Sequence, residues 1–312
     1  MDRNISEYKI HWARIVYLII IALFIFFIIN QIPSLKDSFK DVKIAKIGSY
    51  IVIFGVVLLS FGMAALSYMA LSLKKLKFSR TLIMQFASNT LNKLLPAGIG
   101  AMGANYLYLR RNHLSTISSA TTVAINNFLG VIASIFLLLI LLLSNPSFSL
   151  KLSRVDFGTI ILLTLAIIII VIIIFFVRSI HYKLMRLVHS FLRQLVTYRE
   201  HKLRLFGAFM SQLSLAFFNI LSLTLSMHTV GGNLNILEVM IIYSLAIWFG
   251  SLIPAPGGFG SVDAGLVAAF VAYGTALPQA LATVLVFRLL NFWAPLLIGI
   301  PALIYVRAKQ YI

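Results

Sequence analysis

The stretches LPAGIGAMGA (Leu95–Ala104) and IPAPGGFGSVDA (Ile253–Ala264) repeat one pattern of proline and glycine in the two halves of the chain. Proline removes a backbone donor and fixes φ, whereas glycine reaches backbone conformations closed to other residues. Because apolar sequence flanks both copies, the pattern predicts helices that are broken at membrane depth. A bilayer tolerates such breaks only where protein or a wet cavity satisfies the backbone. Matching breaks in two halves are typical of a transport site.

The composition indicates an integral membrane protein with a single domain, residues 1–312. Hydrophobic residues make up 61% of the chain and the mean hydropathy is +0.99, which is too apolar for a soluble globule. The absence of cysteine excludes disulfides, thiolate metal sites and cysteine catalysis. Met1–Arg14 carries both charge signs, and no small-residue cleavage site follows the apolar run after it. We therefore expect a first transmembrane helix there, not a signal peptide.

Six apolar segments reach the roughly 20 residues that a membrane-spanning helix needs. They are Ala13–Asn30, Ile47–Leu73, Ser115–Leu143, Phe157–Val177, Leu203–Thr229 and Pro278–Val306. The Pro/Gly pattern splits two further apolar regions, Thr81–Leu109 and Leu237–Tyr273. The arms of the first are too short to cross a bilayer, so we interpret both regions as re-entrant hairpins, although the longer arms of the second are also compatible with crossing. The predicted fold is an all-α polytopic membrane protein with about six transmembrane helices and two re-entrant hairpins.

The distribution of lysine and arginine predicts the orientation in the plasma membrane. One side of the predicted topology carries 18 of these residues and the other carries 6, while Lys93 and Arg288 lie within the membrane-depth segments. The positive-inside rule then places both termini in the cytoplasm. Each half, residues 13–143 and 157–306, has three spans and one hairpin. Because three is odd, the halves are inverted relative to each other, and the hairpins enter from opposite faces.

The net charge of +18 does not indicate nucleic-acid binding, because the basic residues lie in loops next to apolar spans. Such loops face anionic lipid headgroups. The densest basic block, His181–Glu200, has apolar residues at helical spacing and cations elsewhere on the helical wheel. This pattern predicts an amphipathic helix on the inner leaflet between the two halves.

Each break predicts a second half-helix that begins near Gly98 or near Gly258, with a buried N-terminus. A helix N-terminus carries about +0.5 charge and free N–H donors, which suit a phosphate group. Asp263 has two interpretations: it meets a lipid amine, or it caps its own helix and pairs with Arg288. For the glycines, close helix packing competes with the close approach of a ligand.

The candidate substrate-binding residues are those of the two motifs together with the polar residues at membrane depth. They are Lys93, Pro96, Gly98, Gly100, Pro254, Pro256, Gly257, Gly258, Gly260, Asp263, Arg288 and Asn291. With two residues inserted, the copies align Gly98 with Gly258, Gly100 with Gly260 and Gly103 with Asp263. Asn126, Asn127 and Asn219 are further intramembrane amides. These amides either bind headgroups or form hydrogen bonds between helices.

The motif P-x-P-G-G-x-G-x-x-acid-x-G at Pro254–Gly265 resembles the signature of the lysylphosphatidylglycerol synthase transmembrane-region family, also called the flippase-like domain family. The segments Asn92–Gly100 and Tyr106–Arg111 resemble the first conserved block of that family, and the resemblance extends over about Asp41 to Val306. The family usually has glutamate at the position of Asp263. Its first block usually has a polar or acidic residue near Gly103, and this chain has none.

The resemblance implies that the protein handles lipids. In the multiple peptide resistance factor, a similar membrane domain flips aminoacylated phosphatidylglycerol that a cytosolic domain makes, and we expect that synthase part to be missing here. Other relatives accompany glycosyltransferases that use lipid-linked sugars. The expected function is therefore a flippase that moves a phospholipid or lipid-linked headgroup through a site formed by the two opposed re-entrant hairpins, with anionic or polyprenyl-phosphate lipids as partners. The alternative is a non-transporting membrane partner of a glycosyltransferase or lipid synthase.

Enzymatic activity is not expected. The sequence lacks the His-Glu-x-x-His motif of intramembrane metalloproteases, and Asp263 is the only aspartate at membrane depth, whereas an aspartyl protease needs two. No nucleotide-binding motif is present, and we expect no metal or cofactor.

Overall fold

The computed structural model describes residues 47–95, 98–144, 201–251, 258 and 260–312. Within these ranges all regular secondary structure is helical. Two predicted spans, Ala13–Asn30 and Phe157–Val177, lie outside the described residues, as does the predicted amphipathic helix at His181–Glu200. The described residues thus include four of the predicted spans and the helical arms of both predicted hairpins.

Four helical segments are long and apolar enough to cross a membrane. They are α2 (Ile47–Leu71), α5 (Thr116–Ser144), α9 (Lys202–Thr229) and the run Leu277–Ala308. That last run consists of α12 (Leu277–Arg288), the π-helical turn η4 (Leu289–Trp293) and α13 (Ala294–Ala308). Each coincides with one of the predicted spans, which confirms that the protein is an integral membrane protein. Large apolar side chains such as Leu203, 86% exposed, lie on the outside of the bundle, as a lipid environment requires.

Both Pro/Gly-containing regions are broken helices. In the first, α3 (Phe78–Leu94) ends at Leu95, which has extended backbone angles, and α4 (Ile99–Arg111) begins after Gly98 at φ 75°. In the second, α10 (Ile236–Ser251) is followed by α11 (Ser261–Ala272), which begins after Gly260 at φ 83°. These positive φ angles explain why glycine stands at both helix starts.

The two arms of each broken helix pack against each other in antiparallel orientation. Gly100 at the start of α4 lies against Leu91 at the end of α3, and Thr81 at the other end of α3 contacts Tyr108 at 3.0 Å. In the second pair Gly250 lies against Val262. One turn away from the break, Gly265 faces Ala246. Both regions are therefore helical hairpins that turn at the Pro/Gly motif.

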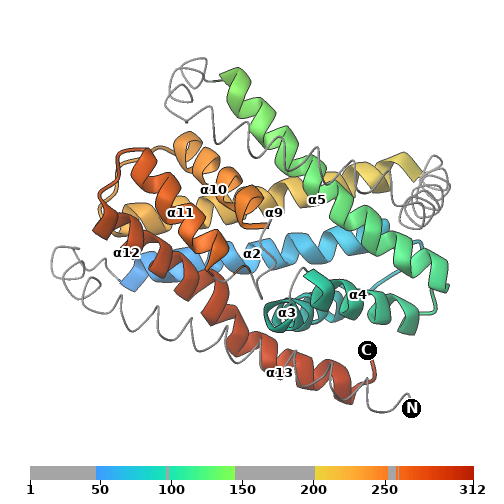
Figure 1. The fold of residues 1–312 in the computed structure, drawn as a ribbon. Helices are drawn as coiled ribbons and strands as arrows, with labels where there is room; N and C mark the ends of the chain where they lie inside the picture. Colours follow the sequence, from blue (N-terminus) through green and yellow to red (C-terminus); the bar gives the residue numbers. More distant parts are fainter. Residues whose placement is uncertain (1–46, 96–97, 145–200, 252–257, 259) are drawn as a thin grey trace, which may run out of the picture.

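Helices α2 and α9, which the predicted repeat makes equivalent, run antiparallel through the middle of the bundle (Figure 1). Leu71 at the end of α2 packs with Ala208 near the start of α9, whereas Ile53 packs with Val230 at the other end. Since α3 follows the end of α2 and α10 follows the end of α9, the two hairpins start from opposite ends of the bundle.

The remaining contacts are reciprocal between the two halves. Helix α13, from the second half, packs on α3 of the first hairpin, and α5, from the first half, packs on α10 of the second hairpin. Each half therefore covers the hairpin of the other. The largest buried apolar cluster joins α2, α3, α4 and α13, and a second cluster joins α9, α10, α11 and α12. The first cluster thus joins helices of both halves, whereas the second lies within the second half.

Candidate functional site

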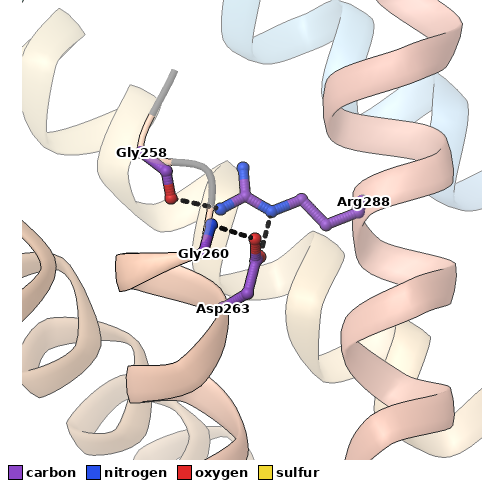
Figure 2. A network of polar contacts seen from close by, with 4 residues as sticks. All are labelled: Gly258, Gly260, Asp263 and Arg288. Carbon is purple, nitrogen blue, oxygen red and sulfur yellow. Dashed lines mark hydrogen bonds and ion pairs between the residues drawn. The ribbon is translucent and has the colours of Figure 1, made fainter. Parts of the chain in front are cut away.

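In the second hairpin, a compact network of polar contacts lies at the start of α11 (Figure 2). Arg288 Nε of α12 forms an ion pair with Asp263 Oδ1 of α11, and Arg288 Nη2 donates to the carbonyl of Gly258 at 3.2 Å. The Gly260 N–H donates to Asp263 Oδ2 at 3.0 Å. Both carboxylate oxygens are therefore engaged, and the side chains of Arg288 and Asp263 are only 13% and 20% exposed. This geometry agrees with the capping-and-pairing interpretation of Asp263.

In the first hairpin, no described acidic residue lies next to the break between α3 and α4. The first turn of α4 has no aspartate or glutamate, and Lys93, in the last turn of α3, is the charged side chain nearest the break. Within the described residues no carboxylate forms an ion pair with Lys93. The N-terminus of α4 and the Lys93 ammonium thus belong to the same hairpin, and no described acid compensates them there, which is a favourable setting for an anion.

The starts of the two half-helices align differently from the prediction made from the glycine spacing. Gly98 and Gly260 are the residues immediately before α4 and α11, so the helix starts pair Gly98 with Gly260. Ala101, not Gly103, then occupies the position of Asp263. The start of α4 is also not enclosed by the described helices, because Ile99 is 60% exposed. That exposure differs from the buried N-terminus that we expected.

Gly100 has a packing role. A Cβ at this position would collide with the backbone of Leu91, so glycine permits α4 to approach α3. At Gly98, by contrast, a Cβ would meet only Asn92 Oδ1 and the end of Met102 at 3.8 Å, and the positive φ is the constraint. The candidate residues Pro96, Pro254, Pro256 and Gly257 lie outside the described residues.

Phe292 in η4 contacts both Lys93 of the first hairpin and Arg288, which pairs with the second hairpin. Lys93 Nζ donates to the carbonyl oxygen of Phe292 and lies 4.4 Å from the centroid of its ring. The Arg288 guanidinium carbon lies 5.6 Å from the same centroid. Phe292 is 7% exposed, so both cations are held against a buried ring. The structure thus brings Lys93, Asp263 and Arg288 into one region.

A polar cavity of about 310 Å³ lies beside the contact between Lys93 and Phe292, between helices of both halves. Among the described residues, nine carboxamide side chains line it. From the first hairpin they are Gln85, Asn89, Asn92 and Asn105. From α5, α9 and η4 they are Asn126, Asn127, Gln212, Asn219 and Asn291. Two serines and Tyr68 add hydroxyl groups, and the described part of the lining contains no lysine, arginine, aspartate or glutamate. The cavity is therefore polar but uncharged.

Some of these amides join helices to one another. Asn126 Oδ1 accepts from Ser67 Oγ at 2.7 Å and from Gln212 Nε2 at 2.8 Å, which links α5 to α2 and α9. Asn291 Nδ2 donates to Asn219 Oδ1 at 3.1 Å. The interpretation as interhelical hydrogen bonds therefore holds for Asn126, Asn219 and Asn291, and the same residues also line the cavity.

Sequence reasoning missed the amides of α3 and the glutamine of α9. Gln85, Asn89 and Asn92 stand at i, i+4 and i+7, so they share one face of a helix. Gln212 stands in an otherwise apolar stretch of α9. The helical spacing of amides on one face of a membrane helix is the signal that would have found this wall of the cavity.

Asn92 and Asn291 line the cavity, and the residues that follow them, Lys93 and Phe292, contact each other. The contact between Lys93 and Phe292, which we call the cationic junction, is thus at the edge of the uncharged cavity. Polar side chains gathered inside an apolar bundle are costly unless they serve a pathway or a binding site. The arrangement provides one neutral polar compartment and one positive edge.

Comparison with curated proteins gives no match to this chain. The family model described as "Lysylphosphatidylglycerol synthase TM region" matches residues 14–299, which include both hairpins, the cavity and the cationic junction. This match confirms the resemblance noted in the sequence, and the chain belongs to the lysylphosphatidylglycerol synthase transmembrane-region family.

Proposed function

We propose that the protein is a lipid flippase, which moves a phospholipid or lipid-linked headgroup between leaflets. The observation that carries this proposal is the uncharged polar cavity inside an apolar bundle, lined from both halves and bordered by Lys93. A polar headgroup that enters hydrocarbon without partners loses several kcal/mol per group, of order 2–7. The cavity amides replace the lost hydration, while the lipid chains remain outside along the exposed apolar faces.

The phosphate of the lipid is assigned to the first hairpin. Lys93 supplies a cationic group there, and the α4 N-terminus adds the positive end of a helix dipole. At the second hairpin Asp263 already engages Arg288 and the Gly260 N–H. In this proposal the first hairpin forms a wall of the cavity and receives the charge, whereas no described residue of the second hairpin lines the cavity.

The membrane topology proposed with this function has six spans, both termini in the cytoplasm and two re-entrant hairpins that enter from opposite faces. The antiparallel α2 and α9 support the inverted halves. A single cysteine introduced in place of Lys43 or Lys151 should react with an impermeant label from outside. One introduced in place of Lys75 or Arg193 should react from inside. Labelling at Lys75 and Lys151 from the same side would contradict this topology.

The function is tested in vesicles that contain the purified protein and a trace of labelled lipid. The measured quantity is the rate at which the label becomes accessible in the opposite leaflet, for phosphatidylglycerol, its lysyl form and a polyprenyl-phosphate lipid. We expect wild type to exceed empty vesicles for at least one lipid. Lys93→Met should lower that rate at least about tenfold, because a desolvated charge pair is worth more than 1.4 kcal/mol. Lys75→Met, in an exposed loop, is the matched control.

Wild-type rates equal to those of empty vesicles for all three lipids would refute the flippase proposal. The alternative, a membrane partner for a lipid synthase or a lipid-dependent glycosyltransferase, would then lead. That alternative predicts that Lys93→Met leaves partner binding unchanged, since the junction lies inside the bundle and not on a docking surface.

A further inference from the structure

The described lining of the cavity carries no charged side chain, which restricts the headgroup that it can hold. The described part of the chain contains two acidic residues, Glu238 and Asp263, and neither lines the cavity. Glu238 accepts from the Asn235 N–H at the start of α10, and Asp263 is engaged by Arg288 and Gly260. A headgroup amine would thus enter without a carboxylate to meet it, and a buried unpaired ammonium is strongly unfavourable.

We propose that the cavity binds an uncharged polyhydroxyl headgroup, a glycosyl or glycerol unit, whose phosphate lies at the Lys93 edge. This inference rests on the proposed flippase function and names its substrate class. A carboxamide offers both a donor and an acceptor, and so does a hydroxyl group. A wall of amides therefore matches a ligand with several neighbouring hydroxyls better than one with a single charge.

Two amides of the lining remain available for such a ligand. Asn89 of α3 and Asn127 of α5 form no side-chain hydrogen bond within the described part of the chain, in contrast to the bonded pair Gln85 and Asn105. Unpaired polar groups are rare in protein interiors, and ligand hydroxyls are the groups that would satisfy these.

The size of the cavity agrees with a headgroup and not with a whole lipid. Ligand pockets of proteins are roughly 300–1,000 Å³, and this cavity, at about 310 Å³, stands at the lower end of that range. It accommodates one small polar unit, while the phosphate remains at the edge formed by Lys93 and Phe292. The lipid chains stay outside the bundle in this arrangement.

Binding is measured by native mass spectrometry of the purified protein in detergent, so that the result does not depend on transport. Four lipids compete at equal concentration: a polyprenyl-phosphate monosaccharide, phosphatidylglycerol, lysylphosphatidylglycerol and bare polyprenyl phosphate. We expect the glycosyl lipid, the glycerol lipid or both to bind at least about tenfold more tightly than the lysyl lipid. Comparison of the glycosyl lipid with phosphatidylglycerol shows whether a sugar or a glycerol unit supplies the hydroxyl groups.

Variants connect this preference to the cavity. Asn127→Leu should lower binding of the preferred lipid about tenfold, whereas Asn233→Leu, on an exposed loop, should leave it unchanged. Asn127→Asp should shift the preference toward the lysyl lipid, because it supplies the missing carboxylate. This second variant is informative even if Asn127→Leu folds poorly.

Equal or tighter binding of the lysyl lipid to wild type would overturn the inference. Competition by a free methyl glycoside as strong as that of the glycosyl lipid would also overturn it, because the site would then hold soluble sugars. A hydroxyl-lipid preference without any transport in vesicles would refute the flippase function alone. The two proposals therefore fail in different assays.

Discussion

The two hairpins have the same backbone design but opposite electrostatics. In each, a glycine at positive φ begins the second arm. The second hairpin neutralises its helix start with Asp263 and then pairs Asp263 with Arg288, whereas the first has Ala101 at the corresponding position and keeps the charge of Lys93. The comparison teaches that a repeated fold motif need not repeat its function. One copy is stabilised by an internal ion pair, and the other remains available for an anion.

The largest expected effect comes from breaking the ion pair of the second hairpin. Asp263→Ala leaves Arg288 buried beside a helix start without its carboxylate, and we expect a loss of about 3–5 kcal/mol in unfolding free energy. Arg288→Leu should cost a similar amount. Because replacing both charges by apolar residues is often tolerated, the double variant Asp263→Leu/Arg288→Leu should recover much of the loss. Thermal unfolding in detergent measures this, and strictly additive losses would contradict the coupling.

The packing of the first hairpin gives the next largest effect. Gly100→Ala places a methyl group against the backbone of Leu91, and overpacking of this kind costs about 1–3 kcal/mol. Gly103→Ala is the matched control on the same helix, because no other atom lies within 4 Å of its Cβ position. We expect the melting temperature to fall for Gly100→Ala and not for Gly103→Ala. Equal behaviour of the two variants would show that Gly100 has no packing role.

A substitution that gives the first hairpin the acidic residue of the second tests the comparison further. Ala101→Asp introduces a carboxylate at the position that Asp263 occupies in α11, in the hairpin that carries Lys93. We expect transport of an anionic lipid to fall about tenfold, since about 1.4 kcal/mol of lost phosphate stabilisation has that effect. Folding should be little changed, because an acid in the first turn of a helix is worth only about 0.3–1 kcal/mol. Unchanged transport of the anionic lipid would contradict the assignment of the phosphate to this hairpin.

The smallest expected effect concerns the ring between the hairpins. Phe292→Leu removes the aromatic face under Lys93 and keeps the backbone carbonyl that Lys93 binds. A cycle of Phe292→Leu, Lys93→Met and the double variant should give a coupling of about 0.5–2 kcal/mol in unfolding free energy. A coupling of zero would mean that the carbonyl alone holds Lys93.

The sequence was sufficient to predict the helices and their breaks because both depend on local properties. Apolar length set the four spans within the described residues, and the positive φ at Gly98 and Gly260 set the breaks. The pairing of Asp263 with Arg288 was also among the sequence interpretations, because a buried charge in a membrane needs a partner. The start of α4 after Gly98 was predicted, whereas α11 begins after Gly260 and not at Gly258, since glycine spacing alone does not say which glycine precedes the helix.

The cavity could not be predicted from the motifs, because it forms where separate helices meet. Gln85, Asn92, Gln212 and Asn291 come from three different parts of the chain, and only the packing of α3, α9 and η4 brings them together. The Lys93–Phe292 contact likewise joins residues that are far apart in the sequence. Long-range contacts of this kind leave no local pattern, apart from the spacing of amides along α3.

The central claim, that the first hairpin and not the second receives the lipid phosphate, is tested most directly by removing charge from one hairpin at a time. The measurement is the rate at which a labelled anionic lipid changes leaflet in vesicles with equal amounts of folded protein. We predict that Lys93→Met lowers the rate at least about tenfold. The double variant Asp263→Asn/Arg288→Gln, which keeps hydrogen-bonding groups but no charge, should transport at close to the wild-type rate. Loss of transport in the double variant with full activity in Lys93→Met would contradict the claim.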